Sequence, residues 1–382
     1  MHTTFKKSIM TSSDRVGRPV ASGSPSRKLN VRAGLSSTPA TVTVVIPCFN
    51  YARYLPDAVD SALAQQGADV EVIIVDDKST DDSLAVARRL AGADRRITVL
   101  AHETNTGPVQ TFNDGLALAR GEFLVRLDAD DLLTPSAFKR ALAVMQRFPT
   151  VGLVYGHPIH FIDGERPAHR NIATSWTIWP GRDWLEACCK KGFNVITSPE
   201  VLMRRSVIDE VGGQMPLAHT HDMEMWLRIA AFSDIAYIHG ADQAWHREHP
   251  KSLSAREVTA FRDLIERKDA FDLLFQGKAA RIPQARSFHA KANAALAADA
   301  IRLAITQYDR GAPQDREIEM LRDVARALVA DVEAVPGWAG LECRMAMGAE
   351  RARRHPRYVL ERIIRGFRSR YSHWKWHRAG EW

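Results

Sequence analysis

The sequence lacks the features by which membrane-spanning proteins, secreted proteins and small metal-binding proteins are identified. No run approaches the roughly 18 apolar residues that a membrane-spanning helix needs, and the N-terminus has basic residues without the apolar core of a secretory signal. Of only four cysteines in 382 residues, Cys188 and Cys189 are adjacent, and Cys48 and Cys343 are isolated. This spacing matches neither a disulfide framework nor a Cys-x-x-Cys metal site. We therefore expect a cytoplasmic protein whose thiols are reduced and mostly structural.

The middle of the chain also lacks the positive net charge that the whole chain has. The formal net charge is +7, but residues 1–40 (seven Lys/Arg, one Asp) contribute +6 and residues 351–382 (ten Lys/Arg, two Glu) contribute +8. The remaining residues therefore carry −7, which disfavours a nucleic-acid-binding core. Residues 1–40 are rich in Ser, Gly, Pro and Arg and poor in aromatic residues, so we expect a disordered basic segment there.

Alternating strand and helix patterns begin at Thr41. Short β-branched runs such as TVTVVIP are typical of strands buried on both faces of a parallel sheet, and apolar residues at helical spacing lie between them. The predicted strands cover residues 41–47, 70–75, 97–100 and 122–127, and the predicted helices cover residues 56–66, 82–91 and 109–119. Thr134 and Pro135 predict the start of another helix that ends near Arg147. The pattern predicts an α/β fold with a mostly parallel sheet flanked by helices.

Acidic residues follow two of the predicted strands. Asp76 and Asp77 follow one strand, and Asp128, Asp130 and Asp131 follow another, in the stretch FLVRLDADDLL. The carboxyl ends of parallel strands border a common ligand crevice, where like charges repel one another unless a cation is bound. Mg²⁺ and Mn²⁺ take carboxylate ligands together with substrate phosphates. The sequence therefore predicts a Mn²⁺ or Mg²⁺ cofactor and a nucleoside diphosphate at this edge.

Four stretches together resemble the motifs of one enzyme family. They are VVIPCFNYARYLPDAVDSALAQQ, VIIVDDKSTDDS, NTGPVQTFNDGLALARGEFLVRLDADD and HTHDMEMWLRIA. Each motif alone is modest, but the four in this order and at these separations resemble the family 2 glycosyltransferases over about residues 41–255. The resemblance implies the GT-A fold, with a Rossmann-like sheet, and a nucleotide-sugar donor.

The resemblance also implies roles for single residues on the donor side. Pro47 and Phe49 would line the nucleoside pocket, and Asp77 would hydrogen-bond the nucleobase. Asp128 would approach the ribose, and Asp130, the second acid of the Asp-x-Asp motif, would bind the metal on the diphosphate.

Two further stretches extend the implied site. Asp222 in HTHDMEMWLR occupies the position of the general base, which would deprotonate an acceptor hydroxyl for in-line attack with inversion at the anomeric carbon. The segment WHREHPKSLS, residues 245–254, resembles a closing loop over the donor. There Arg247 would neutralise the diphosphate and His249 would be a further metal ligand.

The sequence departs from the commoner family pattern in two places. His221-Asp222 stands where many members have Glu-Asp, which affects the electrostatic environment of the base. The stretch TFN, residues 111–113, stands where many members have Arg-Asn, which affects the contacts to the donor phosphates.

Several residues also have ordinary structural explanations. Asp128 and Asp130 could be turn residues, and Asp76 or Asp77 could cap the helix that begins near Ser83. His219 could join His221 in a transition-metal site, or both could be surface or capping residues. The tryptophans could stack on an acceptor sugar or could be core packing; they are Trp176, Trp179 and Trp184.

The C-terminal third is predicted to be helical. We divide the chain into a disordered segment (1–40), a GT-A domain (41–255), a helical extension (256–350) and a basic amphipathic tail (351–382). In the tail, apolar residues repeat every four positions from Val359 to Tyr371, with arginines between them and tryptophans near the end. Such a helix suits an anionic membrane surface, where lipid-linked acceptors are found; the alternative is docking on the acidic core.

Three functions are compatible with these patterns. The favoured one is an inverting, metal-dependent glycosyltransferase of polysaccharide biosynthesis that takes a nucleotide-diphospho-sugar donor and a glycan or lipid-linked acceptor. We expect it in the cytoplasm, peripheral on the inner face of the membrane through residues 351–382, with no nucleic-acid partner. The alternatives are a degenerate GT-A domain that binds a glycan or partner, and a sugar nucleotidyltransferase. The latter is disfavoured because PCFNYARYL, after the first strand, has no glycine.

Overall fold

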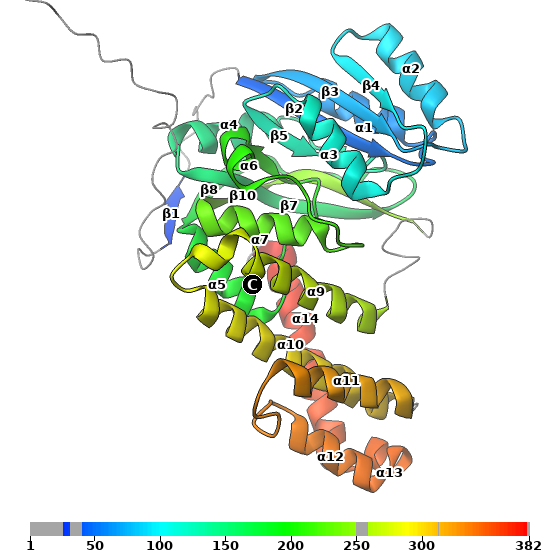
Figure 1. Ribbon diagram of the computed structural model, residues 1–382, viewed down its shortest axis with the longest axis vertical. Helices are drawn as coiled ribbons and strands as arrows, with labels where there is room; N and C mark the ends of the chain where they lie inside the picture. The colour runs from blue at the N-terminus through cyan, green and yellow to red at the C-terminus, as the bar shows by residue number, and fades with distance from the viewer. Residues whose placement is uncertain (1–25, 31–39, 250–258, 312, 380–382) are drawn as a thin grey trace, which may run out of the picture.

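A computed structural model describes residues 26–30, 40–249, 259–311 and 313–379. Its centre is one mixed sheet with the strand order β1-β8-β10-β7-β9-β5-β2-β3-β4, and β6 pairs with β10 at its side (Figure 1). The strands are β1 (Arg27–Asn30), β2 (Ala40–Cys48), β3 (Ala68–Asp76), β4 (Ile97–Ala101), β5 (Phe123–Arg126), β6 (Leu132–Leu133), β7 (Val151–Ile162), β8 (Asn171–Trp179), β9 (Leu202–Arg204) and β10 (Asp234–Glu248).

The N-terminal half of the sheet is parallel, as predicted. Strand β2 pairs in parallel with both β3 and β5, and β3 pairs in parallel with β4. The connecting helices are α1 (Leu55–Leu63), α2 (Ser83–Ala93), α3 (Pro108–Leu118) and α4 (Ala137–Arg147). All four predicted strands and the three predicted helices between them are confirmed. The other half is mixed, because β7 and β10 are parallel to each other while β8 and β9 run antiparallel to their neighbours.

Buried β-branched residues explain why the parallel strands occupy the middle of the molecule. In β2, Val44 and Ile46 belong to the apolar cluster on one face of the sheet, whereas Val45 belongs to the cluster on the other face. Ile74 and Val75 divide in the same way in β3. Strands with apolar side chains on both faces must be covered twice, which is why helices lie on both sides of this half.

Two local predictions near the ends of elements are wrong. Thr134 is not the N-cap of α4, because its hydroxyl donates to the Asp242 carbonyl at 2.6 Å and Ser136 is the residue that precedes the helix. Residues 27–30 lie within the segment predicted to be disordered, yet they form β1 antiparallel to the end of β8. The remainder of that segment, apart from Ser26 and Ala40, lies outside the described residues.

Further helices cover the mixed half of the sheet and extend away from it (Figure 1). Long α10 contacts α5, α9 and α11, and one apolar cluster runs without a break from Val45 in the sheet to Leu341 in α12. These helices are α5 (Gly181–Lys191), α6 (Arg205–Val211), α7 (His221–Phe232), α9 (Ala260–Gln276), the short 3₁₀ helix η2 (Lys278–Arg281), α10 (Ala285–Arg310), α11 (Asp315–Leu328), α12 (Trp338–Met347), α13 (Ala349–Arg354) and α14 (Pro356–Ala379). The helical extension therefore shares a core with the sheet, and the predicted boundaries at residues 255 and 350 stay predictions.

None of the helices within the described ranges has the length and apolar character to cross a membrane.

Candidate active site

The Asp-x-Asp turn lies at the carboxyl end of β5. The Leu127 N–H donates to the Val45 carbonyl of β2 at 3.0 Å, and the Asp131 N–H closes a turn onto the Asp128 carbonyl at 3.0 Å. Asp130 and Asp131 are buried, whereas the Asp128 side chain is 32% exposed. The strand thus ends in a tight turn that brings three carboxyl groups to one edge of the sheet.

Asp130 faces the end of β10. Its Oδ2 lies 2.9 Å from Nε2 of His249, and its carboxylate also forms a hydrogen bond with the hydroxyl of Tyr51. Burial raises the pKa of Tyr51, and the charge of Asp130 raises it further, so the phenol stays protonated and donates. The structure therefore brings together the two residues predicted to bind metal, from segments 119 positions apart.

The Asp130–His249 pair fits a divalent cation in part. A 2.9 Å separation is about the edge length between adjacent ligands of an octahedral ion whose ligands lie ~2.1 Å away. Among the residues with described positions, however, no group of three or more His, Cys, Asp or Glu residues could hold a metal. A bound ion would therefore need oxygen ligands from phosphate or water besides Asp130 and His249, as is usual for Mg²⁺.

Arg247 holds this turn against the neighbouring loop. Its backbone N–H donates to Asp131 Oδ1 at 2.8 Å, and its guanidinium donates to the Asp130 carbonyl at 2.9 Å and to Asp163 at 2.7 Å. The guanidinium is buried between the rings of Tyr54 and Phe161, at 4.5 and 4.7 Å from their centroids. These contacts fix the shape of the Asp-x-Asp turn, and they occupy the group that the sequence assigned to the diphosphate.

Asp131 forms an ion pair with His246, at 3.0 Å from its Nδ1. Burial lowers the pKa of His246, but the charge of Asp131 outweighs burial and raises that pKa above its ordinary value. His246 therefore balances one of the three carboxylates from within the protein.

Asp77 organises the loop between β4 and α3. Its buried carboxylate accepts hydrogen bonds from the Thr106 N–H at 2.7 Å and the Gly107 N–H at 2.9 Å, and it lies 2.9 Å from Nδ1 of His102. Burial raises the pKa of Asp77, but these hydrogen bonds outweigh burial and lower it, so Asp77 is ionised. On the neighbouring strand, Phe49 is 42% exposed at the end of β2, where a ring could stack on a base, whereas Pro47 is buried.

Asp222 lies in the first turn of α7 and is joined electrostatically to the Asp-x-Asp turn. Arg126 donates to both Asp128 oxygens, at 2.8 and 3.0 Å, and to Ser198 Oγ at 3.1 Å. Burial raises the pKa of Asp222 to about 6, the charge of Arg126 lowers it, and the charge of Asp128 raises it. Arg126 was not predicted to belong to the site, since its sole signal is a positive charge inside the otherwise apolar strand β5.

The two departures from the family pattern have structural explanations. Burial lowers the pKa of His221 to about 3, so it is neutral beside Asp222. Asn113 does not point into the site: its side chain accepts from the Gln214 N–H at 2.8 Å and donates to the Gln214 carbonyl at 2.9 Å. The TFN stretch therefore anchors the loop before α7.

Other side chains have structural partners. His219 lies 3.5 Å from Asp263 and 3.6 Å from Glu266, so its imidazole is held by carboxylates of α9. Trp176 and Trp184 are buried in the two core clusters. Asp76 accepts from the Ser79 N–H at 3.1 Å, three residues away, and so supports the turn after β3 without capping α2.

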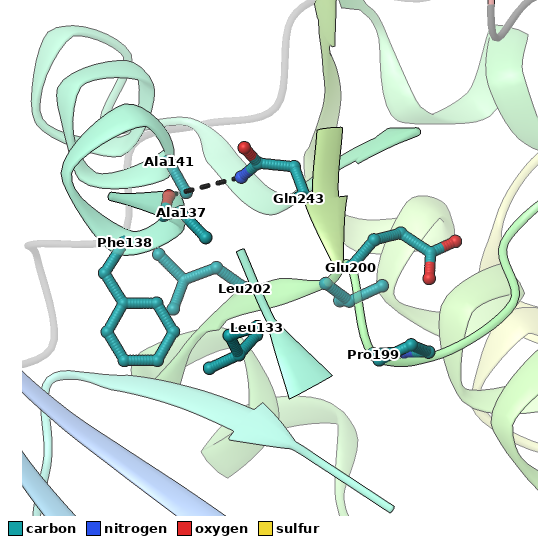
Figure 2. A pocket seen from close by; sticks show the side chains of 9 residues that line it. Leu133, Ala137, Phe138, Ala141, Pro199, Glu200, Leu202 and Gln243 are labelled. Carbon is teal, nitrogen blue, oxygen red and sulfur yellow. Dashed lines mark hydrogen bonds between the residues drawn. The ribbon is translucent and has the colours of Figure 1, made fainter. Parts of the chain in front are cut away.

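Two cavities differ sharply in size and surroundings. One is a gap of about 10 Å³ beside Gln243. Figure 2 shows its lining of mainly apolar side chains such as Leu133 and Phe138, with the Glu200 carboxylate turned away from them. It holds at most one water and is a packing defect. The second is a cleft of about 1080 Å³ that Asp222 lines together with residues of α9, α10 and α14.

The fold and the site geometry together define a GT-A type domain. Acidic residues follow two parallel strands, and the further carboxylate, Asp222, lies on α7 beside the mixed half of the sheet. Residues 43–212 match the family model described as glycosyl transferase family 2. The resemblance inferred from the sequence is thereby confirmed.

Known relatives match a part of the chain. An uncharacterized glycosyltransferase of Nostoc sp. is 40% identical over 123 residues, which cover 32% of this chain and 38% of the relative. The succinoglycan biosynthesis protein ExoO of Rhizobium meliloti is 38% identical over 101 residues (26% and 28%). The chondroitin synthase of Pasteurella multocida is 36% identical over 114 residues (30% and 12%). The chain thus matches between 12% and 38% of the length of these relatives.

Solved structures agree in fold. The mannosyltransferase PcManGT of Pyrobaculum calidifontis, in complex with GDP-Man and Mn²⁺, is 20% identical with a TM-score of 0.52, over 90% of this chain and 88% of that one. The S. aureus protein TarS is 15% identical with a TM-score of 0.50, over 76% and 54%. These likenesses confirm the predicted GT-A fold.

Proposed function

We propose that the chain is an inverting, metal-dependent glycosyltransferase that moves a sugar from a nucleotide-diphosphate donor to an acceptor hydroxyl. The observation that carries the proposal is that two carboxylates lie in different surroundings. Asp130, with His249, lies in the turn after β5, whereas Asp222 lines the large cleft and senses the charges of Arg126 and Asp128. The reaction needs one carboxylate to bind a cation and another to accept a proton, and these two roles require different surroundings.

On the donor side, Asp130 and His249 would hold Mn²⁺ or Mg²⁺, with donor phosphate oxygens completing the ligand set. The ion would supply charge stabilisation for the leaving nucleoside diphosphate. Asp128 would approach the ribose. Phe49 would stack on the base beside the loop that Asp77 fixes, and Pro47 would support the strand end below it.

On the acceptor side, Asp222 would be the general base. It would accept the proton of the acceptor hydroxyl as that oxygen bonds to the anomeric carbon and the bond from that carbon to the donor phosphate oxygen breaks. A pKa of about 6 suits this role, because the carboxylate is ionised at neutral pH and remains a useful base. Attack from the face opposite the leaving group inverts the anomeric configuration.

The product class follows from the relatives. One relative, ExoO, is a succinoglycan biosynthesis protein, and another is a chondroitin synthase. We infer a role in building a surface polysaccharide or similar glycan, with a glycan or lipid-linked acceptor.

Helix α14 would bring the enzyme to an anionic membrane surface. Its sequence holds seven Lys or Arg residues and one Glu. Six large side chains along it are between 43% and 68% exposed: Leu360, Ile363, Ile364, Phe367, Tyr371 and Trp374. Apolar and basic groups on one exposed helix are the combination that anionic bilayers bind.

The test is calorimetric titration of the full chain with UDP, GDP, CDP and TDP, first with Mn²⁺ and then with EDTA. We expect one nucleotide to bind, and only with metal, and its sugar conjugate to be turned over in a donor screen. Absence of binding by all four would favour a degenerate GT-A domain that binds a glycan or partner without catalysis. Turnover of a sugar phosphate and a nucleoside triphosphate would indicate a nucleotidyltransferase.

A further inference from the structure

Most of the lining of the large cleft beside Asp222 comes from parts of the chain that the family match does not cover. Beyond residue 212, its walls come from α9, α10 and α14, together with the first turn of α7. Its volume of about 1080 Å³ exceeds the size of most small-molecule sites and leaves room for more than one sugar ring. Because Asp222 lines this cleft, a molecule bound there can present a hydroxyl group to that carboxylate.

Helix α14 has two opposite faces at this cleft. At 100° per residue, Arg362, Arg365 and Ser369 share the face that lines the cleft, whereas Ile363 and Phe367 lie on the exposed side. The helix is tied to α10 at one end of the cleft, where buried Asp309 pairs with Arg365 and lies 3.6 Å from Arg362 (Figure 1). The lining segment from Arg362 to Ser372 extends about 15 Å along the helix axis.

The charges around the cleft are unbalanced in favour of cations. Seven Lys or Arg residues and four Asp residues line it. Three of the acids already have arginine partners: Asp263 and Asp299 pair with Arg267, and Asp309 pairs with residues of α14. Arg310 and Arg368 line the cleft, yet neither forms an ion pair with any carboxylate in the described part of the chain.

The guanidinium groups of Arg310 and Arg368, on α10 and α14, have no carboxylate partner among the described residues and are suited to an anion. Arginine offers a planar fork of N–H donors that matches phosphate oxygens in pairs. Each of the other arginines of the cleft contacts a carboxylate, with Asp299 and Asp309 shared between several of them.

We propose that the cleft is the acceptor site and that Arg310 and Arg368 bind a phosphate or diphosphate group of the acceptor, so that its sugar hydroxyl reaches Asp222. The proposal rests on the proposed function and adds the chemical class of the acceptor. The apolar stripe on the outer side of α14 is consistent with a lipid-borne phosphate, because the helix that would meet the bilayer also forms a wall of the cleft.

The experiment compares two double variants of the full chain. Arg310→Ala with Arg368→Ala removes the two arginines without ion-pair partners from the cleft. Arg351→Ala with Arg370→Ala is the matched control, since both residues are exposed, lie outside the cleft lining and remove the same charge. Each protein is titrated in EDTA with geranyl diphosphate, a soluble short-chain lipid diphosphate, and with geraniol, its uncharged counterpart. We expect the cleft variant to bind geranyl diphosphate at least tenfold more weakly than wild type, and the control to bind as wild type does.

Three results would overturn the proposal. They are equal affinity in both double variants, no binding of geranyl diphosphate by wild type, and binding of geraniol as tight as that of geranyl diphosphate. A parallel titration with phosphatidylglycerol vesicles tests whether the phosphate comes from bilayer head groups instead of the acceptor. If the cleft variant loses only vesicle binding, Arg310 and Arg368 bind bilayer head groups and the acceptor assignment is wrong. Nucleoside diphosphate binding with Mn²⁺ should be unchanged in the cleft variant, and its absence in wild type would refute the proposed function independently.

Discussion

Asp222 and Asp130 are both proposed to act in the transfer reaction, but their partners differ. His249 and Tyr51 both contact the Asp130 carboxylate and hold it in place, as expected for a metal ligand. Within the described part of the chain, Asp222 accepts hydrogen bonds only from backbone N–H groups, its own and that of Met223 at 2.6 Å, and it borders the cleft. A carboxylate with spare acceptor capacity beside a cleft can take a proton from a bound molecule.

Substitution of these two residues should therefore separate binding from catalysis. We expect Asp222→Asn to bind the nucleoside diphosphate with Mn²⁺ as wild type does and to lose transfer by about a hundredfold to ten-thousandfold, the usual contribution of a general base. Asp130→Ala should lose metal-dependent nucleotide binding. Calorimetry and a transfer assay on each variant measure both quantities, and an equal loss of nucleotide binding in the two would refute the division of roles.

The acid side of the pH profile should report Asp222. Burial raises its pKa to about 6, so the carboxylate is protonated, and useless as a base, below that pH. We expect kcat/KM to fall as the pH decreases through about 6. Because the charge of Arg126 lowers the pKa of Asp222, Arg126→Gln should move this fall to higher pH. An unchanged acid limb in Arg126→Gln would show that another group controls it.

At the scale of elements, α14 depends on one buried cluster of charges. Asp309, at the end of α10, lies 3.3 Å from Arg344 of α12 and pairs with Arg365 of α14. Arg344 is 1% exposed, stacks 3.7 Å above the ring of Tyr358 and also pairs with Glu361 at 2.8 Å. A buried arginine that loses a partner keeps its desolvation cost, so this cluster couples three helices.

Asp309→Ala should therefore destabilise the helical extension. We expect a loss of about 3 kcal/mol in the free energy of unfolding, near the lower end for breaking a buried pair, because Arg344 retains Glu361. Glu319→Ala is the control: the Glu319 side chain is 48% exposed, so removing its pairs with Arg322 and Arg326 should cost less than about 1 kcal/mol. Denaturant unfolding measures both, and similar losses would show that the Asp309 cluster contributes no more than a surface pair.

The parallel half of the fold and the order of its motifs could be predicted because their signals are local. β-branched runs define β2 and β3, an apolar run defines β5, and the acids directly follow β3 and β5. Strand β1 could not be predicted, since four residues inside a polar segment are ordered only by pairing with β8, more than 140 positions away. The same limit applies to Arg247, whose contact with Asp163 depends on two loops that meet only in the folded chain.

The site was predicted as a set of separate roles, whereas the structure joins them through residues to which the motifs assign no role. Arg126 links Asp128 to the environment of Asp222, and Tyr51 joins Asp130. Whether a strand arginine points into a site or into solvent depends on register, which the motif spacing does not specify. The acceptor cleft was likewise invisible in the sequence, because α14 reaches it from more than 130 residues beyond Asp222.

At the scale of the whole molecule, charge and apolar surface are distributed unevenly along the chain. The tail that carries the positive charge is folded back as α14, with arginines toward the cleft and apolar side chains outward. A helix that is apolar on its exposed side would be unfavourable in water unless that side meets another surface. Its basic composition favours an anionic bilayer as that surface.

Removal of the apolar side chains should weaken membrane binding without unfolding the protein. Ile363 and Phe367 are 50% and 68% exposed, so Ile363→Ser with Phe367→Ser leaves the core intact. Because burial of one such side chain contributes about 1.5 kcal/mol, we expect affinity for phosphatidylglycerol vesicles to fall more than tenfold in co-sedimentation. The matched control is Ile162→Ser with Ile172→Ser, which removes side chains that are 76% and 73% exposed on β7 and β8. Equal vesicle binding by both variants would show that the protein contacts the bilayer through another surface. If phosphatidylcholine vesicles bind as tightly as phosphatidylglycerol vesicles, the arginines of α14 do not contribute electrostatic attraction to membrane binding.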